Sequence, residues 1–147
     1  MVDLPLSGKD EIIKFVPQRL PMLMFDGMLE ADDLHAISEF TITNENIFCD
    51  ESVFTVPGVI ENIAQTAAAH NGFIALRNGD PVKLGYIAAV KNLKIFDLPA
   101  VGEKLQTEIK IVNEVMGFVV VEGKVHIDHN EIASCEMNIF ISKDNES

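Results

Sequence analysis

The chain has 147 residues, of which 48% are hydrophobic, and this length suits one domain with its own core. Its 23 acidic residues against 11 lysines and arginines give a formal net charge of −12. This charge argues against nucleic acid and anionic membranes as partners, because binding phosphates needs clustered basic side chains. Two cysteines are too few for a disulfide scaffold, and no apolar run reaches the roughly 20 residues of a membrane helix, so we expect a cytoplasmic protein with reduced thiols.

The first third of the chain predicts a short helix, two strands and a loop. Residues 7–16 form the helix, which Ser7 caps and Pro17 ends. Residues 22–31 and 35–43 are strand candidates, and the second alternates between apolar and polar positions. Residues 44–56 predict an irregular loop that carries more apolar side chains than a solvated loop. We therefore expect this loop to pack against a cleft or a second subunit.

A long helix is predicted over residues 57–77, where apolar residues recur with a helical period. A run of alanines at 67–69 has no bulk and predicts that a neighbouring sheet approaches the helix closely. Residues 78–81, Asn-Gly-Asp-Pro, favour turns and end the helix. Glu61 is a carboxylate in the first full turn, beside the apolar stripe.

Four strands follow the helix, separated by turn-rich segments, over residues 83–96, 104–115, 118–128 and 132–142. This order of elements predicts an α+β domain in which an antiparallel sheet wraps one buried helix. We expect a single domain over residues 1–147, with an ordered core over 5–143 and a polar C-terminal tail. Because one sheet around one helix leaves an open strand edge, dimerisation is expected.

Four stretches that together span nearly the whole chain are similar to motifs of a known family: Val16–Asp26 to "LPHRYPFLLVD", Phe54–Gln65 to "MPGV…EAMAQ", Ala88–Ile95 to "KAKFRRPV" and Val101–Leu105 to "VPGDQL". The chain thus resembles the hot-dog superfamily, and within it the β-hydroxyacyl-(acyl carrier protein) dehydratases of fatty-acid and aryl-polyene synthesis. The resemblance implies a hot-dog domain, in which a curved sheet wraps the central helix. It also implies a homodimer or higher oligomer with active sites at the interface.

The resemblance further implies an activity, the reversible loss of water from a 3-hydroxyacyl thioester on acyl carrier protein or coenzyme A. In that family a loop histidine removes the α-proton, and a carboxylate on the partner's central helix serves the leaving hydroxyl. Glu61 matches that carboxylate by its place in the Glu-x-x-Ala-Gln pattern. Beside apolar residues its pKa is expected to rise, which suits an acid/base group. The structural alternative is a glutamate stabilised by the helix dipole.

Other candidate site residues surround Glu61 in the sequence. Gln65, one helical turn further on, is the second catalytic candidate, through a hydrogen bond to Glu61 or to the substrate. Gly58 and Val59 offer backbone N–H groups at the helix start, which suit a thioester carbonyl. The candidates for substrate binding are Gln18, Phe54 and Asn62. A purely structural use of Gln65 and Asn62 remains open.

His70 lies about 180° around the helix from Glu61 and about 13 Å along it, so the two are not expected to share a site within one subunit. A packing role or an interaction with the helix dipole is expected for this histidine. His126 and Asp128 share a strand face, but two ligands make a poor metal site. We expect neither a metal nor a cofactor.

One departure from the family pattern leaves alternatives open, because residues 44–56 contain no histidine. Gln18 also replaces a second histidine of the opening motif. The chain is therefore either a dehydratase-like enzyme or a catalytically silent, acyl-binding partner subunit of a dehydratase heterodimer. Thioester hydrolysis, with Glu61 activating water, is the third possibility. Docking of an acidic carrier protein would need a basic patch, for which Arg19, Lys91 and Lys94 are candidates.

Overall fold

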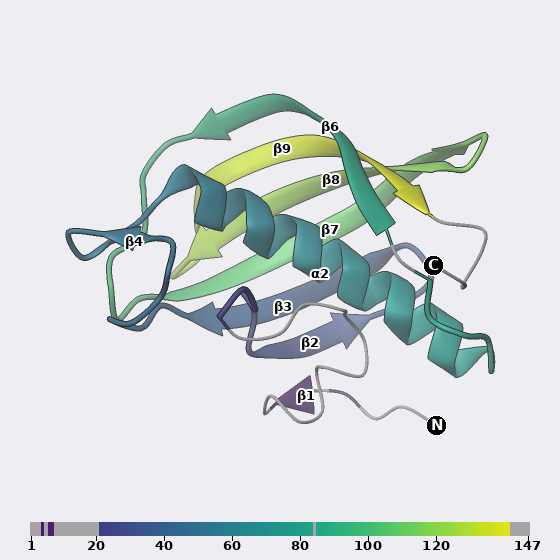
Figure 1. Cartoon of the computed structure of the whole chain (residues 1–147), viewed down its shortest axis with the longest axis horizontal. Coiled ribbons are helices and arrows are strands. Elements are labelled where there is room, and N and C mark those ends of the chain that lie inside the picture. The colour runs from purple at the N-terminus through teal and green to yellow at the C-terminus, as the bar shows by residue number, and fades with distance from the viewer. Residues whose placement is uncertain (1–3, 5, 8–20, 84, 142–147) are drawn as a thin grey trace.

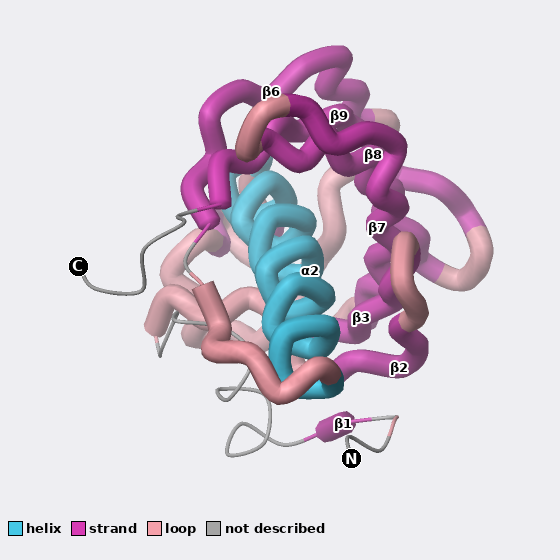
Figure 2. Tube along the Cα trace, turned by 90° about the vertical axis from the view of Figure 1, so that its right-hand side faces the viewer, coloured by secondary structure: helices cyan, strands magenta, loops and turns pink. Residues whose placement is uncertain are grey.

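A curved antiparallel sheet wraps around one long helix in the computed structural model, which describes residues 4, 6–7, 21–83 and 85–141 (Figures 1 and 2). The helix, α2, spans Val56–Arg77. The sheet order is β1-β2-β3-β7-β8-β9-β6, with bounds β1 Leu6–Ser7, β2 Gly27–Ala31, β3 His35–Thr41, β6 Gly85–Ile95, β7 Lys104–Val115, β8 Phe118–Ile127 and β9 Asn130–Ile141. A separate small hairpin joins β4 Cys49–Asp50 to β5 Val53–Phe54. The predicted hot-dog architecture is confirmed.

The predicted elements agree with the structure except near the N-terminus. The long helix and the four later strands lie within two residues of their predicted bounds. The strand predicted over 22–31 begins only at Gly27, and the loop predicted over 44–56 contains the β4–β5 hairpin. The helix predicted over 7–16 lies outside the described residues, except for Ser7, which belongs to β1.

The loop before α2 is held against the start of the helix. Thr55 has an extended backbone, and its N–H and hydroxyl both donate to the carbonyl of Phe48. A Cβ at Gly58 would lie 2.5 Å from the ring of Phe54, so only glycine allows the first turn to pack this closely. The apolar loop therefore packs on the start of its own helix, whereas the sequence predicted packing against a cleft or a second subunit.

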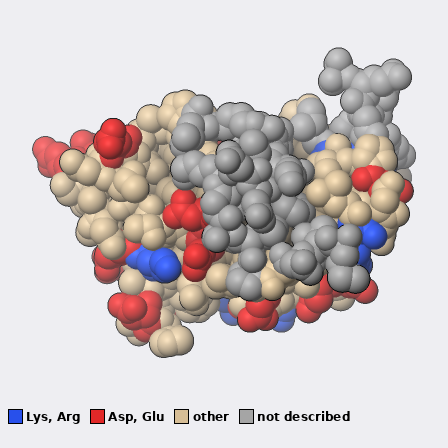
Figure 3. Space-filling view, turned by 90° about the horizontal axis from the view of Figure 1, so that it is seen from below, with Lys and Arg blue, Asp and Glu red and all other residues tan. Residues whose placement is uncertain are grey.

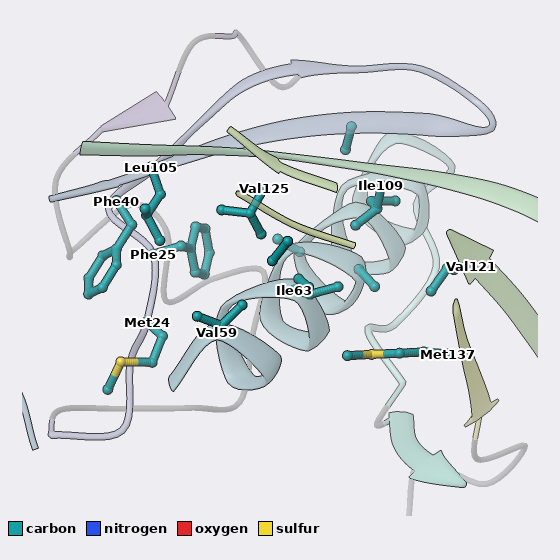
Figure 4. Close-up of a cluster of buried hydrophobic side chains, with 14 of the residues drawn as sticks. Met24, Phe25, Phe40, Val59, Ile63, Leu105, Ile109, Val121, Val125 and Met137 are labelled. Carbon is teal, nitrogen blue, oxygen red and sulfur yellow. The ribbon is translucent and has the colours of Figure 1, made fainter. Parts of the chain in front are cut away.

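The core lies between the helix and the concave face of the sheet. Figure 4 shows Val59 and Ile63 of the helix among side chains of β7, β8 and β9. A close approach is at Gly123 of β8, where a Cβ would lie 2.5 Å from Cγ2 of Ile63. The close approach of a sheet to the helix, which the sequence predicted at the alanine run, is seen here at Ile63.

This contact gives a stability prediction. Gly123→Ala is expected to lower the free energy of unfolding by about 1–3 kcal/mol, because the added methyl group overlaps Ile63. The double variant with Ile63→Ala should lose less stability than the sum of the two single variants, since removing the isoleucine makes room. Urea unfolding of all four proteins measures this coupling, and strictly additive losses would contradict the close contact.

The strand β6 lies at one edge of the sheet and pairs with β9 alone among the described strands. It carries exposed apolar side chains, among them Tyr86, Ile87 and Leu93. A long strand with a free edge and exposed apolar residues is a surface that another chain can pair with. The open edge expected from the sequence is therefore β6.

Acidic side chains outnumber basic ones on the surface, in line with the net charge of the sequence (Figure 3). On the face in Figure 3, carboxylates are scattered and basic side chains do not form a broad patch over the described part. Several of the acidic groups are partnered, for example in the ion pairs Arg77–Asp33 and Lys104–Glu39. No described helix is long and apolar enough to cross a membrane.

Candidate active site

Glu61 opens onto a cavity of about 350 Å³ between α2 and the concave face of the sheet. Small and branched apolar side chains make up most of its wall, and polar groups lie among them. The lining residues are Asp33, Glu61, Ala64, Ala67, Ala68, His70, Asn71, Ile74, Gly85, Tyr86, Ile87, Ile109, Ile111, Glu114, Val119, Val121, Ile139 and Ile141. A cavity of this size and lining suits a largely apolar ligand that also carries polar groups.

The environment of Glu61 favours its neutral form. Burial raises the pKa of the Glu61 carboxyl above its ordinary value, and a hydrogen bond from Gln65 partly offsets the rise. The first turn of α2 holds no acidic residue, because the helix begins at Val56 and Glu61 lies in its second turn. Stabilisation by the helix dipole falls off within the first turn, so the structure favours the acid/base interpretation.

Gln65 and Asn62 hold an extended segment, residues 22–24, against the helix. The Gln65 amide donates to the carbonyl of Met22 at 2.7 Å, and its oxygen accepts from the N–H of Met24 at 2.6 Å. Asn62 donates to the carbonyl of Met24 at 2.7 Å and accepts from the hydroxyl of Thr107 at 2.5 Å. Both side chains are fully buried in this network, and residues 22–24 do not line the cavity beside Glu61.

The other predicted site residues are not all available to a ligand. The N–H of Val59 donates to the carbonyl of Thr55 at 3.1 Å, so it is not the free donor expected at the helix start. Gly58 has no acceptor for its N–H among the described residues, but it is buried. Phe54 is fully buried, and its ring packs 5.8 Å from that of Phe40, in the core and away from the cavity. Gln18 lies outside the described residues.

His70 lines the same cavity as Glu61, although the sequence predicted that the two would not share a site. The cavity runs along the helix, so residues on both of its margins reach it. His70 donates from Nε2 to the carbonyl of Asp32 at 2.6 Å, which ties the ring to the β2–β3 turn, and burial lowers its pKa, which favours the neutral form.

The sequence reasoning missed the alanines as cavity residues. Ala64, Ala67 and Ala68 line the cavity between the helix and the sheet. The larger side chain of Ile63 contacts the sheet at Gly123 and keeps the two layers apart. The available signal was the run of small residues on one helix face, opposite strands rich in valine and isoleucine. A run of small residues allows either close packing of helix and sheet or a cavity between them. The distance between the helix and the sheet decides which of the two forms.

Comparison with known proteins identifies the family. The family described as ApeP-like, ApeP dehydratase, matches residues 10–147 of this chain. The chain belongs to the ApeP-like dehydratase family. This ApeP-like chain is also 32% identical over 138 residues to the 3-hydroxyacyl-(acyl-carrier-protein) dehydratase FabZ of Shewanella loihica, which covers 86% of the chain and 87% of the relative. The FabZ of Shewanella amazonensis is 30% identical over 136 residues, with the same coverage.

The fold of the ApeP-like chain has a near counterpart among solved structures. It is similar to a structure described as the dehydratase heterocomplex ApeI:P from Xenorhabdus doucetiae, with a TM-score of 0.86 and 15% sequence identity. The match covers 99% of this chain and 95% of that one. The resemblance found in the sequence motifs is thus confirmed at the level of family and fold.

The raised pKa of Glu61 gives a pH-dependent stability prediction. The folded protein resists ionisation of this carboxyl, so stability is lost as pH rises through its folded-state pKa, whereas below its ordinary value of 4.5 both states are protonated. Glu61→Gln should therefore raise the free energy of unfolding at about pH 8 and leave it unchanged at about pH 4. Urea unfolding at both pH values checks this, and an equal gain at both would contradict it.

Proposed function

We propose that this chain takes part in the dehydration of 3-hydroxyacyl thioesters on acyl carrier protein, as one subunit of a hot-dog dimer. The observation that carries the proposal is Glu61, a half-buried carboxyl with a raised pKa at the wall of an apolar cavity. A raised pKa favours the protonated form of the carboxyl, which can give its proton to the departing hydroxyl. The cavity beside it holds the acyl chain.

In the proposed reaction a base removes a proton from C2, and the electron pair of that C–H bond forms the C2–C3 double bond. The C3–O bond breaks, and Glu61 donates its proton to the departing oxygen, which leaves as water. The N–H of Gly58, which is buried but has no acceptor among the described residues, is our candidate donor to the thioester carbonyl, on which negative charge develops. Gln65 acts on the reaction through its hydrogen bond to Glu61.

The base that removes the C2 proton is proposed to come from a second subunit. Residues 44–56 contain no histidine, and His70 lies about 13 Å along the helix from Glu61 with its Nε2 tied to Asp32. The ApeI:P structure, which this chain resembles in fold, is described as a dehydratase heterocomplex. A related subunit with a loop histidine would supply the missing group.

The second subunit is proposed to bind along the free edge of β6. Tyr86 and Ile87 of this strand are exposed, and both also line the cavity beside Glu61. A partner that pairs with β6 would therefore cover the open side of the cavity and bring its own residues next to Glu61. The site is complete only in such a dimer.

The test is turnover of a 3-hydroxyacyl carrier-protein thioester by this chain alone and after co-expression with a histidine-bearing hot-dog subunit. For the complex we expect the intact thioester to lose the mass of one water, which mass spectrometry detects. Release of free thiol would instead support thioester hydrolysis. A complex whose activity survives any substitution of Glu61 would support the second candidate, a silent acyl-binding subunit, which the absence of a histidine from residues 44–56 favours.

A further inference from the structure

The β7–β8 hairpin ends in an exposed apolar tip, residues 115–118, with the sequence Val-Met-Gly-Phe. Figure 1 shows this hairpin extending past the other strands at the right of the view. Met116 is 93% and Val115 is 47% exposed. None of the four residues is charged, although the chain has a formal net charge of −12. The tip is therefore an apolar projection from an acidic protein.

Methionine is an unfavourable residue for the turn at this tip. Met116 and Gly117 lie between the paired residues Val115 and Phe118, and their φ angles are 48° and 88°. A two-residue turn with both φ angles positive favours Asn-Gly or Asp-Gly, because most other side chains are crowded in this region. Met116 also packs against almost nothing in its own subunit. Its cost to the fold points to a role outside the subunit.

A groove of about 790 Å³ lies beside the tip, between the hairpin and the end of α2. Its lining includes apolar side chains, such as Ile74 and Pro81, and two groups of opposite charge. These are Lys83, on the segment after the helix, and Glu114, on β7. In the part of the chain that the structure describes, neither of them forms an ion pair. The groove thus offers an apolar surface with one charge of each sign.

We propose that the hairpin tip of one subunit docks in the groove of a second copy of this chain, whose own tip docks in the first groove in return. Because tip and groove are neighbours on each subunit, one two-fold axis forms both contacts. The same axis brings Lys83 of each copy towards Glu114 of the other, so the groove is complementary in charge to its own copy. This contact involves neither Glu61 nor the edge of β6, so it goes beyond the proposed function and does not depend on it.

Met116→Asn tests the contact without endangering the fold. Asparagine suits the turn better than methionine, so the variant should be more stable to urea than the wild type. Its self-association should nevertheless weaken about tenfold or more, because the apolar side chain that docks is lost. Sedimentation equilibrium from about 5 to 500 μM protein measures this association, which should be weak because the contact is small. The control is Ile47→Asn, an exposed residue in the loop before α2, which should associate like the wild type.

A charge exchange tests whether the occupant of the groove is a second copy. Lys83→Glu and Glu114→Lys should each weaken the association a few-fold, and the double variant should recover most of it, since opposite charges meet again across the two-fold axis. A wild-type mass that does not change with concentration, unweakened association of Met116→Asn, or a double variant no better than the single ones would overturn the contact. None of these results bears on Glu61, so the proposed function is decided by its own experiment.

Discussion

Glu61→Gln is expected to lower the dehydration turnover of the assembled complex by roughly 10²- to 10⁴-fold, the usual contribution of a positioned proton donor. Glutamine has nearly the same shape, so the cavity and its hydrogen bond with Gln65 can persist while the ionisable proton is lost. The measurement is single-turnover conversion of a 3-hydroxyacyl carrier-protein thioester. Binding of a saturated S-acyl pantetheine thioester, which has no hydroxyl to lose, should change little, and this separates loss of chemistry from loss of the site.

The control for this variant is Glu122→Gln on the exposed face of β8, a carboxylate that does not line the cavity. It should leave turnover within about twofold, as surface substitutions away from a site usually have small effects. Equal turnover of wild type and Glu61→Gln would remove Glu61 from the mechanism. In that case the subunit serves the complex only by binding the acyl chain.

Asn62→Ala carries the largest expected effect on stability. The variant leaves the carbonyl of Met24 and the hydroxyl of Thr107 without their buried partner. Each buried polar group that is left unpaired costs about 1–3 kcal/mol, so the total loss in the free energy of unfolding should be about 2–6 kcal/mol. Urea unfolding should show a lower midpoint at an unchanged slope.

A double-mutant cycle with Thr107→Val separates this structural role from the substrate-binding role predicted for Asn62. The two losses of stability should be non-additive, because the side chains of Asn62 and Thr107 are hydrogen-bonded to each other and each variant removes the same bond. Additive losses, or an Asn62→Ala protein as stable as the wild type but with a higher KM, would restore the substrate-binding interpretation. We expect instead that the losses are coupled and that Asn62→Ala lowers stability. KM should then change only to the extent that the fraction of folded protein falls.

Most of the elements could be predicted because their signals are local. The helix over 57–77 and the four later strands follow from apolar periodicity and from glycine and proline at the turns. The strand predicted from Met22 was wrong at its start because an apolar run was read as a paired strand. Residues 22–24 are instead held by side-chain hydrogen bonds from Asn62 and Gln65, partners about 40 residues away that no local pattern indicates.

The sequence by itself determined the family, the order of the long helix and the later strands, and the position of Glu61 on that helix, because motif and periodicity are written along the chain. Only the tertiary structure decided what surrounds that carboxyl. The contact of Gly123 with Ile63 sets the spacing of helix and sheet, and that spacing leaves the alanine face lining a cavity that His70 also reaches. This spacing depends on contacts between side chains from segments that are distant in the sequence. Those contacts form only when the sheet has folded around the helix, so no local pattern in the sequence predicts them.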